Sequence, residues 1–265
     1  MPITSSQNLT YKNIVKLIED KKYRIEQKLF WIDGANFVDT AIENNWKIDR
    51  LVFVSDKIST NFKHSILNKI PENKQLIFSE KLYSHLSTKK NIQGIGAVVE
   101  QKFFSNTILK GAAIVLENIS NPGNLGTIIR NCVAFDIKNI YIINPSVDPF
   151  NSETVRATMS GLFFMNISIF EKISIFIEKL KEAKNYTLIG TSLQFDSINL
   201  RKYKKKYKNI DDVLILFGSE AKGMSDELKT SCHDLLKIEM SPNIDSLNIA
   251  ESAAIILYEL FGQNS

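Results

Sequence analysis

Residues 118–130 read Asn118-Ile-Ser-Asn-Pro-Gly-Asn-Leu-Gly-Thr-Ile-Ile-Arg130, and they follow an apolar run at 112–116. The sequence from Asn121 to Asn124 is typical of a turn, because proline fixes φ while glycine and asparagine tolerate positive φ. Apolar residues then recur at helical spacing, which predicts a strand, a tight loop and a helix capped by Asn121 or Asn124. Such a helix start aims several backbone N–H groups at one point. Taken alone, the segment is also explained by an ordinary βα turn.

The composition is that of a soluble globular protein with one large or two small domains. The chain has 265 residues, of which 44% are hydrophobic and 23% charged, and its formal net charge of +4 is compatible with a polyanionic partner. Cys132 and Cys232 have no metal-like spacing, so we interpret both as core thiols and expect no metal site. The sequence shows neither an apolar leader nor a membrane-length apolar run. We expect a cytoplasmic protein without membrane contact, or one in the interior of an organelle if a targeting segment is missing here.

The first hundred residues predict a compact α/β unit, with strands at 29–32, 51–54 and 76–78 and a last strand after Gly94. The segment Gly94-Ile-Gly96 precedes a strand and lacks the third glycine of a dinucleotide motif, which excludes that site. No nucleophile, metal set or acid–base pair is evident, so this unit is interpreted as a binding module. We place the domains at residues 1–105 and 106–265.

Strands and helices alternate from residue 112, which predicts a mostly parallel sheet with helices on both faces and ligands at the carboxyl ends of its strands. Two further polar loops follow predicted strands, one between Phe217 and Ser225 and one after a strand at 236–240. The apolar helix at 249–261 must be buried in the core or against a partner. Three loops rich in Gly, Asn and Ser are therefore expected at one edge of the sheet.

The order and spacing of these stretches resemble the motifs of the SpoU/TrmH family of RNA ribose methyltransferases, in the SPOUT class. The first motif lies between Asn118 and Arg130, the second between Leu216 and Gly223, and the third between Ile238 and Ala250. The first domain resembles the ribosomal-protein-like substrate-binding module of the family, for example at Asp33-Gly34 and Gln93-Gly94. The thiopeptide-resistance rRNA methyltransferases share this two-domain plan.

The resemblance implies an α/β fold in which the catalytic domain carries a deep trefoil knot. It also implies a homodimer with the active site at the subunit interface. The ligand would be S-adenosylmethionine, bound in the knot mainly by backbone groups. The cofactor-binding residues that it implies are Thr191, Gly218, Ile238, Met240 and Leu247.

The implied reaction is methyl transfer to a ribose 2′-OH of RNA, with ribosomal RNA favoured over tRNA because minimal tRNA-modifying relatives lack the first domain. Arg130 is assigned to the 2′-OH, either as a desolvated base or as a cation that stabilises the developing alkoxide. Arg156 is a candidate phosphate contact. The implied catalytic residues are Arg130, Asn124, Glu220, Ser246 and Asn248.

Other interpretations stay open at this point. The chain could be a tRNA 2′-O-methyltransferase, or a non-catalytic relative that binds RNA or the ribosome. The basic run Arg201-Lys-Tyr-Lys-Lys-Lys-Tyr-Lys208 is either a solvated loop or an RNA contact in which Tyr203 and Tyr207 stack on bases. A Rossmann nucleotide enzyme has little support, because its glycine signature and ribose-binding acid are absent.

Overall fold

The computed structural model describes residues 2–58, 66–88, 91–104, 107–183, 186–193, 197–206, 212–219 and 222–262. The contacts between residues divide the chain into two compact units. The first consists of Met1–Lys102 and Asp148–Phe163, and the second of Phe103–Val147 and Phe164–Ser265.

The described residues of the first unit form a four-stranded sheet with helices on both faces. Its strands are β1 (Leu29–Asp33), β2 (Ile48–Phe53), β3 (Gln75–Ile77) and β4 (Ile95–Glu100), in the order β1-β4-β2-β3. β4 runs antiparallel to β1 and β2, whereas β3 runs parallel to β2. The helical segments are α1 (Leu9–Glu19), α2 (Lys21–Gln27), α3 (Ala35–Glu43), η2 (Glu72–Lys74), α5 (Glu80–Ser84), α7 (Ser152–Ala157) and η3 (Gly161–Phe164), whose last residue belongs to the second unit.

Alternate residues of these strands face opposite sides, as the pleat requires. Trp31, Val52 and Val98 pack with apolar residues of α1 and α5 in one core cluster. Phe30, from the other face of β1, contacts the rings of Trp46 and Phe150, with ring centroids 6.0 and 4.8 Å away. The predicted α/β unit therefore forms.

Asp148–Phe163 packs with the first unit, although its position in the sequence led us to expect it in the second domain. The guanidinium of Arg24, 1% exposed, donates from Nε to Asp148 Oδ2 at 2.7 Å and from Nη1 to the carbonyl oxygen of Leu17 at 2.8 Å. Trp46 donates its indole N–H to the carbonyl oxygen of Phe163 at 3.1 Å. Arg24 lies 124 residues from Asp148, and Trp46 lies 117 residues from Phe163, which no local pattern reveals. The functional domain limits stay a prediction.

The second unit is built on one parallel sheet. Within the described residues it has seven strands in the order β7-β6-β5-β10-β8-β11-β9, and every neighbouring pair is parallel, which confirms the predicted parallel sheet. The strands are β5 (Ala113–Glu117), β6 (Asn139–Ile143), β7 (Asn166–Phe170), β8 (Thr187–Thr191), β9 (Ile198–Asn199), β10 (Val213–Phe217) and β11 (Asp234–Lys237).

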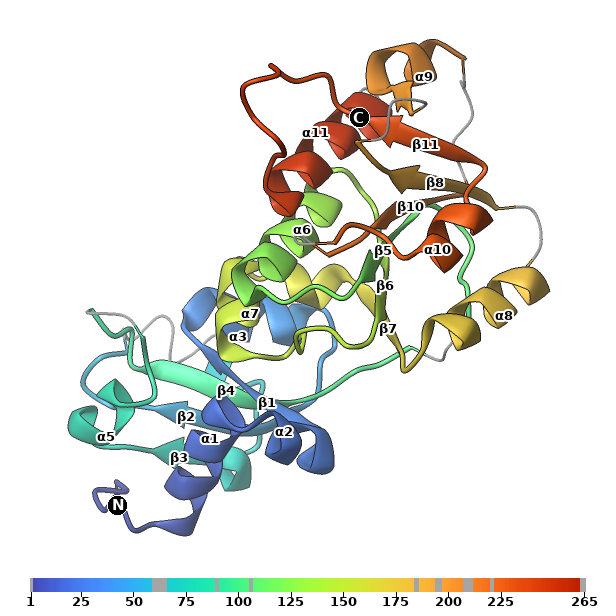
Figure 1. Cartoon of the computed structure of the whole chain (residues 1–265). Helices are drawn as coiled ribbons and strands as arrows, with labels where there is room; N and C mark the ends of the chain where they lie inside the picture. The colour runs from blue at the N-terminus through green and yellow to red at the C-terminus, as the bar shows by residue number, and fades with distance from the viewer. Residues whose placement is uncertain are drawn as a thin grey trace. The chain divides into compact units, whose positions relative to one another are not determined.

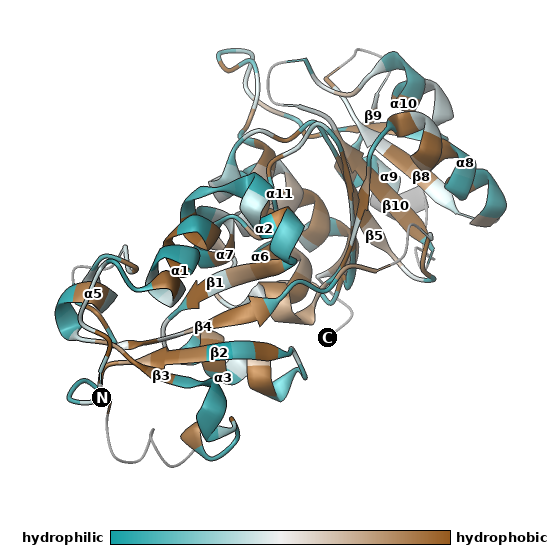
Figure 2. Ribbon diagram, turned by 90° about the horizontal axis from the view of Figure 1, so that it is seen from below, coloured by the Kyte–Doolittle hydropathy of each residue, from teal (hydrophilic) through white to brown (hydrophobic). Residues whose placement is uncertain are grey.

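Helices cover both faces of this sheet. They are α6 (Pro122–Ala134), α8 (Ile173–Ala183), α9 (Leu200–Lys206), α10 (Asp226–Ser231) and α11 (Ile249–Phe261). Figure 1 shows α6 and α11 on one side of the sheet and α8 and α10 on the other. All residues of β6 and β10 are buried, as expected for strands covered on both faces, and Figure 2 shows β5, β8 and β10 largely in the brown of apolar residues.

The strand order brings three loops together. β10 lies between β5 and β8, and β11 lies between β8 and β9. Because all these strands are parallel, the loops that follow β8, β10 and β11 leave the same edge of the sheet side by side. This edge is where the site forms.

Helix α6 begins as the sequence predicts. Asn121 is its N-cap, and Asn121 Oδ1 accepts a hydrogen bond from the N–H of Asn124 at 3.0 Å. Pro122 occupies the first helical position, where its missing N–H costs nothing. Of the two predicted caps, Asn121 is therefore the right one.

Two local predictions were wrong. Tyr203 cannot stack on bases, because it is 1% exposed and lies in α9, where we considered a loop; Tyr207 lies outside the described residues. The strand expected at 236–240 ends at Lys237.

None of the helices in the described part of the chain combines the length and the apolar character that a membrane crossing requires.

Candidate active site

A cavity of about 810 Å³ lies at the carboxyl ends of three neighbouring strands. Thr191 ends β8, Gly218 follows β10 and Ile238 follows β11, and all three line the cavity. This volume falls within the range of about 300–1,000 Å³ that is usual for small-molecule sites. The cavity therefore lies where ligands bind in parallel α/β sheets.

One face of α11 forms a wall of this cavity. Ile249, Ser252 and Ile256 line it, and their i, i+3, i+7 spacing places them on the same side of the helix. Ala253 and Leu257 of the same helix are fully buried, and α11 packs against α6 and α9. The predicted burial of this helix is thus confirmed for one of its faces.

The loop after β10 depends on a glycine. Ser219 and Gly223 exchange two backbone hydrogen bonds of 3.0 and 2.9 Å, which fold the loop back on itself. A Cβ on Gly218 would overlap the backbone carbon of Gly223 and the backbone nitrogen of Met224. Any side chain at 218 would therefore force the loop away from its present course. Where this loop ends, before α10, Glu117 Oε2 accepts a hydrogen bond from the N–H of Ser225 at 2.8 Å.

A hydrogen bond joins the first and third motifs. Asn248 Nδ2 donates to Asn124 Oδ1 at 3.0 Å, across 124 residues of sequence. Asn248 also caps α11, because its Oδ1 accepts from the N–H of Ala250 at 2.8 Å. Asn131 Nδ2 donates to the carbonyl oxygen of Ala250 at 3.1 Å and ties α6 to the same turn. Two of the predicted catalytic residues are therefore in direct contact.

The predicted catalytic residues differ in whether they line the cavity. Ser246 and Asn248 are exposed and line the cavity. Arg130 is exposed on α6 and does not line the cavity, and its guanidinium makes no hydrogen bond or ion pair with another described residue. Glu220 lies outside the described residues, so its predicted role is not tested by the structure.

All five residues predicted to bind the cofactor line this one cavity, although they come from three separate loops: Thr191, Gly218, Ile238, Met240 and Leu247. Their role stays a prediction. The cavity has further lining residues that were not predicted as site residues. Phe217, Ser219, Lys222 and Gly223 lie in the second motif of the sequence, and Ile249, Ser252 and Ile256 share one face of α11. The other lining residues are Ser192, Leu193, Met224, Lys229, Leu236, Lys237 and Asp245.

The lining suits a ligand with a flat apolar part and a charged end. Leu193, Met224 and Leu236 offer apolar surface, and the ammonium groups of Lys222 and Lys229 can balance a carboxylate. Gly218 also lines the cavity, and it contributes backbone atoms only because it has no side chain. These features fit S-adenosylmethionine, which has an adenine ring and an amino-acid end.

Neither thiol is poised as a nucleophile. Burial raises the pKa of Cys132 to about 12 and that of Cys232 to about 11, so both stay protonated at neutral pH. Cys132 is fully buried in α6, as predicted for a core thiol, whereas Cys232 is only half-buried and donates to the carbonyl oxygen of Leu228 at 3.2 Å.

Comparisons with known proteins agree with this geometry. Residues 111–258 match the model of the SpoU rRNA Methylase family, and residues 8–97 match the MRM3-like substrate binding domain. The 23S rRNA (guanosine(2553)-2′-O)-methyltransferase RlmP of Bacillus subtilis is 26% identical over 264 residues, which cover 98% of this chain and 99% of that protein.

Two further relatives extend the comparison. A tRNA (guanosine(18)-2′-O)-methyltransferase of Thermus thermophilus is 30% identical over 150 residues, 55% of this chain and 72% of the relative. The AdoMet-bound rRNA methyltransferase from Sinorhizobium meliloti superposes with a TM-score of 0.87 at 28% identity, over 99% of this chain and 98% of that one.

Proposed function

The chain belongs to the SpoU rRNA methylase family, and on that basis we propose that it transfers a methyl group from S-adenosylmethionine to a ribose 2′-OH of RNA. The observation that carries the proposal is the single cavity at the ends of β8, β10 and β11, with Asn248 on its lining and Asn124 bonded to Asn248. The Bacillus relative is named as a 2′-O-methyltransferase of rRNA and the Thermus relative as one of tRNA.

The cavity would hold the cofactor through Thr191, Gly218, Ile238, Met240 and Leu247. When bound, S-adenosylmethionine supplies a methyl group that is already activated on a positively charged sulfur. The protein therefore has two tasks, to align the ribose oxygen with that methyl group and to help the hydroxyl lose its proton.

Arg130 is the proposed partner of the 2′-oxygen. Arginine side chains stay protonated in proteins, so the simplest role for Arg130 is to stabilise the negative charge that develops on the oxygen. Asn124, Ser246 and Asn248 would orient the ribose through their amide and hydroxyl groups. Glu220 is proposed to orient Arg130, on the resemblance of its motif alone.

We further propose a homodimer whose active site combines two copies of the chain. Arg130 is exposed and does not line its own cavity, so a second copy could present it to the cavity of the first. Ile255 and Tyr258 of α11 are 40% and 65% exposed, an apolar surface suited to burial in such an interface.

The second unit is also proposed to contain a deep trefoil knot. After β8 the chain moves out to β9, returns to the centre as β10, moves out again as β11 and comes back as α11 beside α6. This repeated return supports a knotted path. A crystal structure traced continuously from 187 to 261 would test it.

Ribosomal RNA is the proposed substrate, and tRNA is the second candidate. The first unit supports ribosomal RNA, because residues 8–97 match a substrate-binding domain, and the Thermus tRNA enzyme aligns with only 55% of the chain. We place the reaction in the cytoplasm, where such RNA is modified.

Mapping of 2′-O-methyl groups on rRNA and tRNA, from cells with and without the protein, tests the function. We expect one ribose in ribosomal RNA to lose its methyl group in the deletion strain and to regain it on complementation. Unchanged methylation of both RNA pools would overturn the proposal. Calorimetry that shows no binding of S-adenosylmethionine would instead support a non-catalytic relative.

A further inference from the structure

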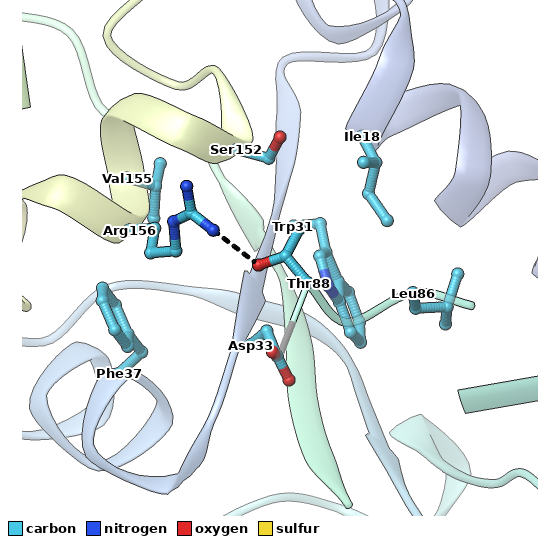
Figure 3. Close-up of a pocket in the computed structure, with 9 residues that line it drawn as sticks. All are labelled: Ile18, Trp31, Asp33, Phe37, Leu86, Thr88, Ser152, Val155 and Arg156. Carbon is cyan, nitrogen blue, oxygen red and sulfur yellow. Dashed lines mark hydrogen bonds between the residues drawn. The ribbon is translucent and has the colours of Figure 1, made fainter. Parts of the chain in front are cut away.

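A second, smaller cavity lies in the first unit, and Figure 3 shows its lining. It has a volume of about 40 Å³. At about 10–15 Å³ for each water centre, it has room for roughly three water molecules or the edge of one small ring. Apolar side chains form most of the wall, with polar groups between them: Ile18, Trp31, Phe37, Leu86 and Val155, then Asp33, Thr88, Ser152 and Arg156.

A buried hydrogen-bond donor in this wall has no acceptor. Trp31 is 3% exposed, and its indole Nε1 has no hydrogen-bond partner among the described residues. Figure 3 shows its ring between the Arg156–Thr88 pair and Leu86. A buried donor without a partner destabilises the folded state. A ligand with a carbonyl oxygen would remove that cost.

Asp33 supplies an acceptor in the same wall. Its Oδ1 accepts from the hydroxyl of Tyr83 at 2.7 Å, and its Oδ2 accepts from the hydroxyl of Ser87 at 2.6 Å. Burial, and to a smaller extent the charge of Asp33, raises the pKa of Tyr83, so the phenol stays a donor. A carboxylate offers about four acceptor positions, so Asp33 can also accept from a ligand while these two donors hold it in place.

A cation stands at the mouth of the cavity. Arg156 is exposed, and its Nη1 donates to Thr88 Oγ1 at 3.0 Å, as the dashed line in Figure 3 shows. Its guanidinium can contact a phosphate while the cavity holds the group attached to it. The cavity thus combines an aromatic ring, one donor, one acceptor and a rim cation.

We propose that this cavity takes the edge of one unpaired base of the RNA substrate and selects guanine or uracil. Only these two of the four bases carry a ring N–H next to a carbonyl group, which would pair with the Asp33 carboxylate and the Trp31 N–H. Unpaired bases of RNA are commonly recognised by aromatic stacking and by hydrogen bonds to their edges. The size of the cavity excludes a base pair. The inference rests on the proposed action on RNA.

Binding of five-nucleotide RNAs to the full chain tests base selection. Four probes differ only in the central nucleotide, which is guanosine, uridine, adenosine or cytidine, flanked by adenosines. Because one good base contact is worth about 1–3 kcal/mol, we expect guanosine and uridine to bind at least about fivefold tighter by fluorescence anisotropy at fixed salt. Equal affinities for the four probes would overturn the proposal.

Two matched variants locate the effect. Ser152→Phe puts a bulky ring on the cavity wall, whereas Glu153→Phe puts the same ring on the next, exposed residue, which does not line the cavity. We expect Ser152→Phe to abolish the preference and Glu153→Phe to keep it. If both variants keep the preference, the cavity is not the site. Should Ser152→Phe fail to fold, Thr88→Trp at the exposed rim serves the same purpose.

Methyl transfer to ribosomal RNA by the wild-type chain separates this inference from the proposed function. A chain that methylates RNA but shows no base preference refutes the base site alone. A chain that transfers no methyl group refutes the function, while the probe affinities still decide whether the cavity selects a base.

Discussion

The side chain of Asn248 makes two hydrogen bonds, and different substitutions can separate their contributions. Its Oδ1 caps α11 at the N–H of Ala250, and its Nδ2 reaches Asn124 Oδ1 on α6. Serine caps helices about as well as asparagine does, but its side chain is too short to bridge to Asn124. The capping contribution and the contribution to the active site are therefore measurable in different variants.

We expect Asn248→Ser to keep the stability of the wild type within about 0.5 kcal/mol, while Asn248→Ala loses about 1 kcal/mol with the cap. Methyl transfer should fall at least about tenfold in both variants, because both lose the bond to Asn124. Urea unfolding and initial rates are the measurements. A Ser variant with the wild-type rate would show that the bond to Asn124 does not position catalytic groups.

Gly218 lies at a position of the cavity wall that has no room for a side chain. We expect Gly218→Ala to weaken S-adenosylmethionine binding at least about tenfold, equivalent to about 1.4 kcal/mol, because a Cβ there overlaps the backbone of Gly223 and Met224. Ser219→Ala is the control, since it removes only the hydroxyl that accepts from the N–H of Lys222. Calorimetry giving equal affinities for both variants would contradict this view of the loop.

At the level of elements, a buried ion pair holds the segment Asp148–Phe163 in the first unit. The side chains of Arg24 and Asp148 are 2% and 7% exposed. Removing one partner from such a pair typically costs about 3–5 kcal/mol, since the other charge stays buried without compensation.

Asp148→Ala should therefore destabilise the first unit by about 3–5 kcal/mol in urea unfolding followed by tryptophan fluorescence. Asp39→Ala is the control, because Asp39 pairs with Lys69 at 3.7 Å on the surface, and an exposed pair contributes at most about 1 kcal/mol. Similar losses in the two variants would mean that the buried pair does not hold the segment.

Much of this element structure follows from local patterns. The turn at 121–124 predicted the start of α6, and the apolar runs predicted the four strands of the first sheet. The alternation of strands and helices after residue 112 predicted the parallel sheet of the second unit. The convergence of the loops after β10 and β11 also follows from sequence, because parallel strands end at one edge. Thr191, at the end of β8, was expected there only from the family resemblance. These features depend on neighbours in the chain or on a general rule of sheets.

The remaining features depend on distant contacts. The pairing of Arg24 with Asp148 spans 124 residues, and nothing near either residue predicts it. Tyr203 lies among lysines and arginine in the sequence, yet it is buried, because one side of α9 packs inward. Met159 has helical neighbours but a left-handed backbone, which apolar periodicity does not report. The cavity beside Trp31 likewise combines residues from four distant segments.

On the scale of the whole molecule, the proposed dimer can be tested by mixing two variants, each impaired in a different part of the site, at a concentration of S-adenosylmethionine too low for Gly218→Ala to bind it. If Arg130 acts in the cavity of the other copy, a mixed dimer of Arg130→Ala and Gly218→Ala contains one complete site. Random assembly makes about half of the dimers mixed, so the mixture should recover about a quarter of the wild-type activity. A co-expressed mixture no more active than either variant alone would place Arg130 and the cavity in one chain, or show that the chain acts as a monomer.

The most direct measurement compares Arg130→Ala with the wild type in vitro. Transfer of a labelled methyl group from S-adenosylmethionine to ribosomal RNA is followed, the RNA is digested to nucleosides, and cofactor affinity is measured in parallel by calorimetry. We predict a 2′-O-methylated nucleoside from the wild type, a loss of at least about a hundredfold in the variant, and a cofactor affinity within about threefold of the wild type. Cofactor binding lost together with activity, or activity retained without Arg130, would contradict the proposed role of this residue.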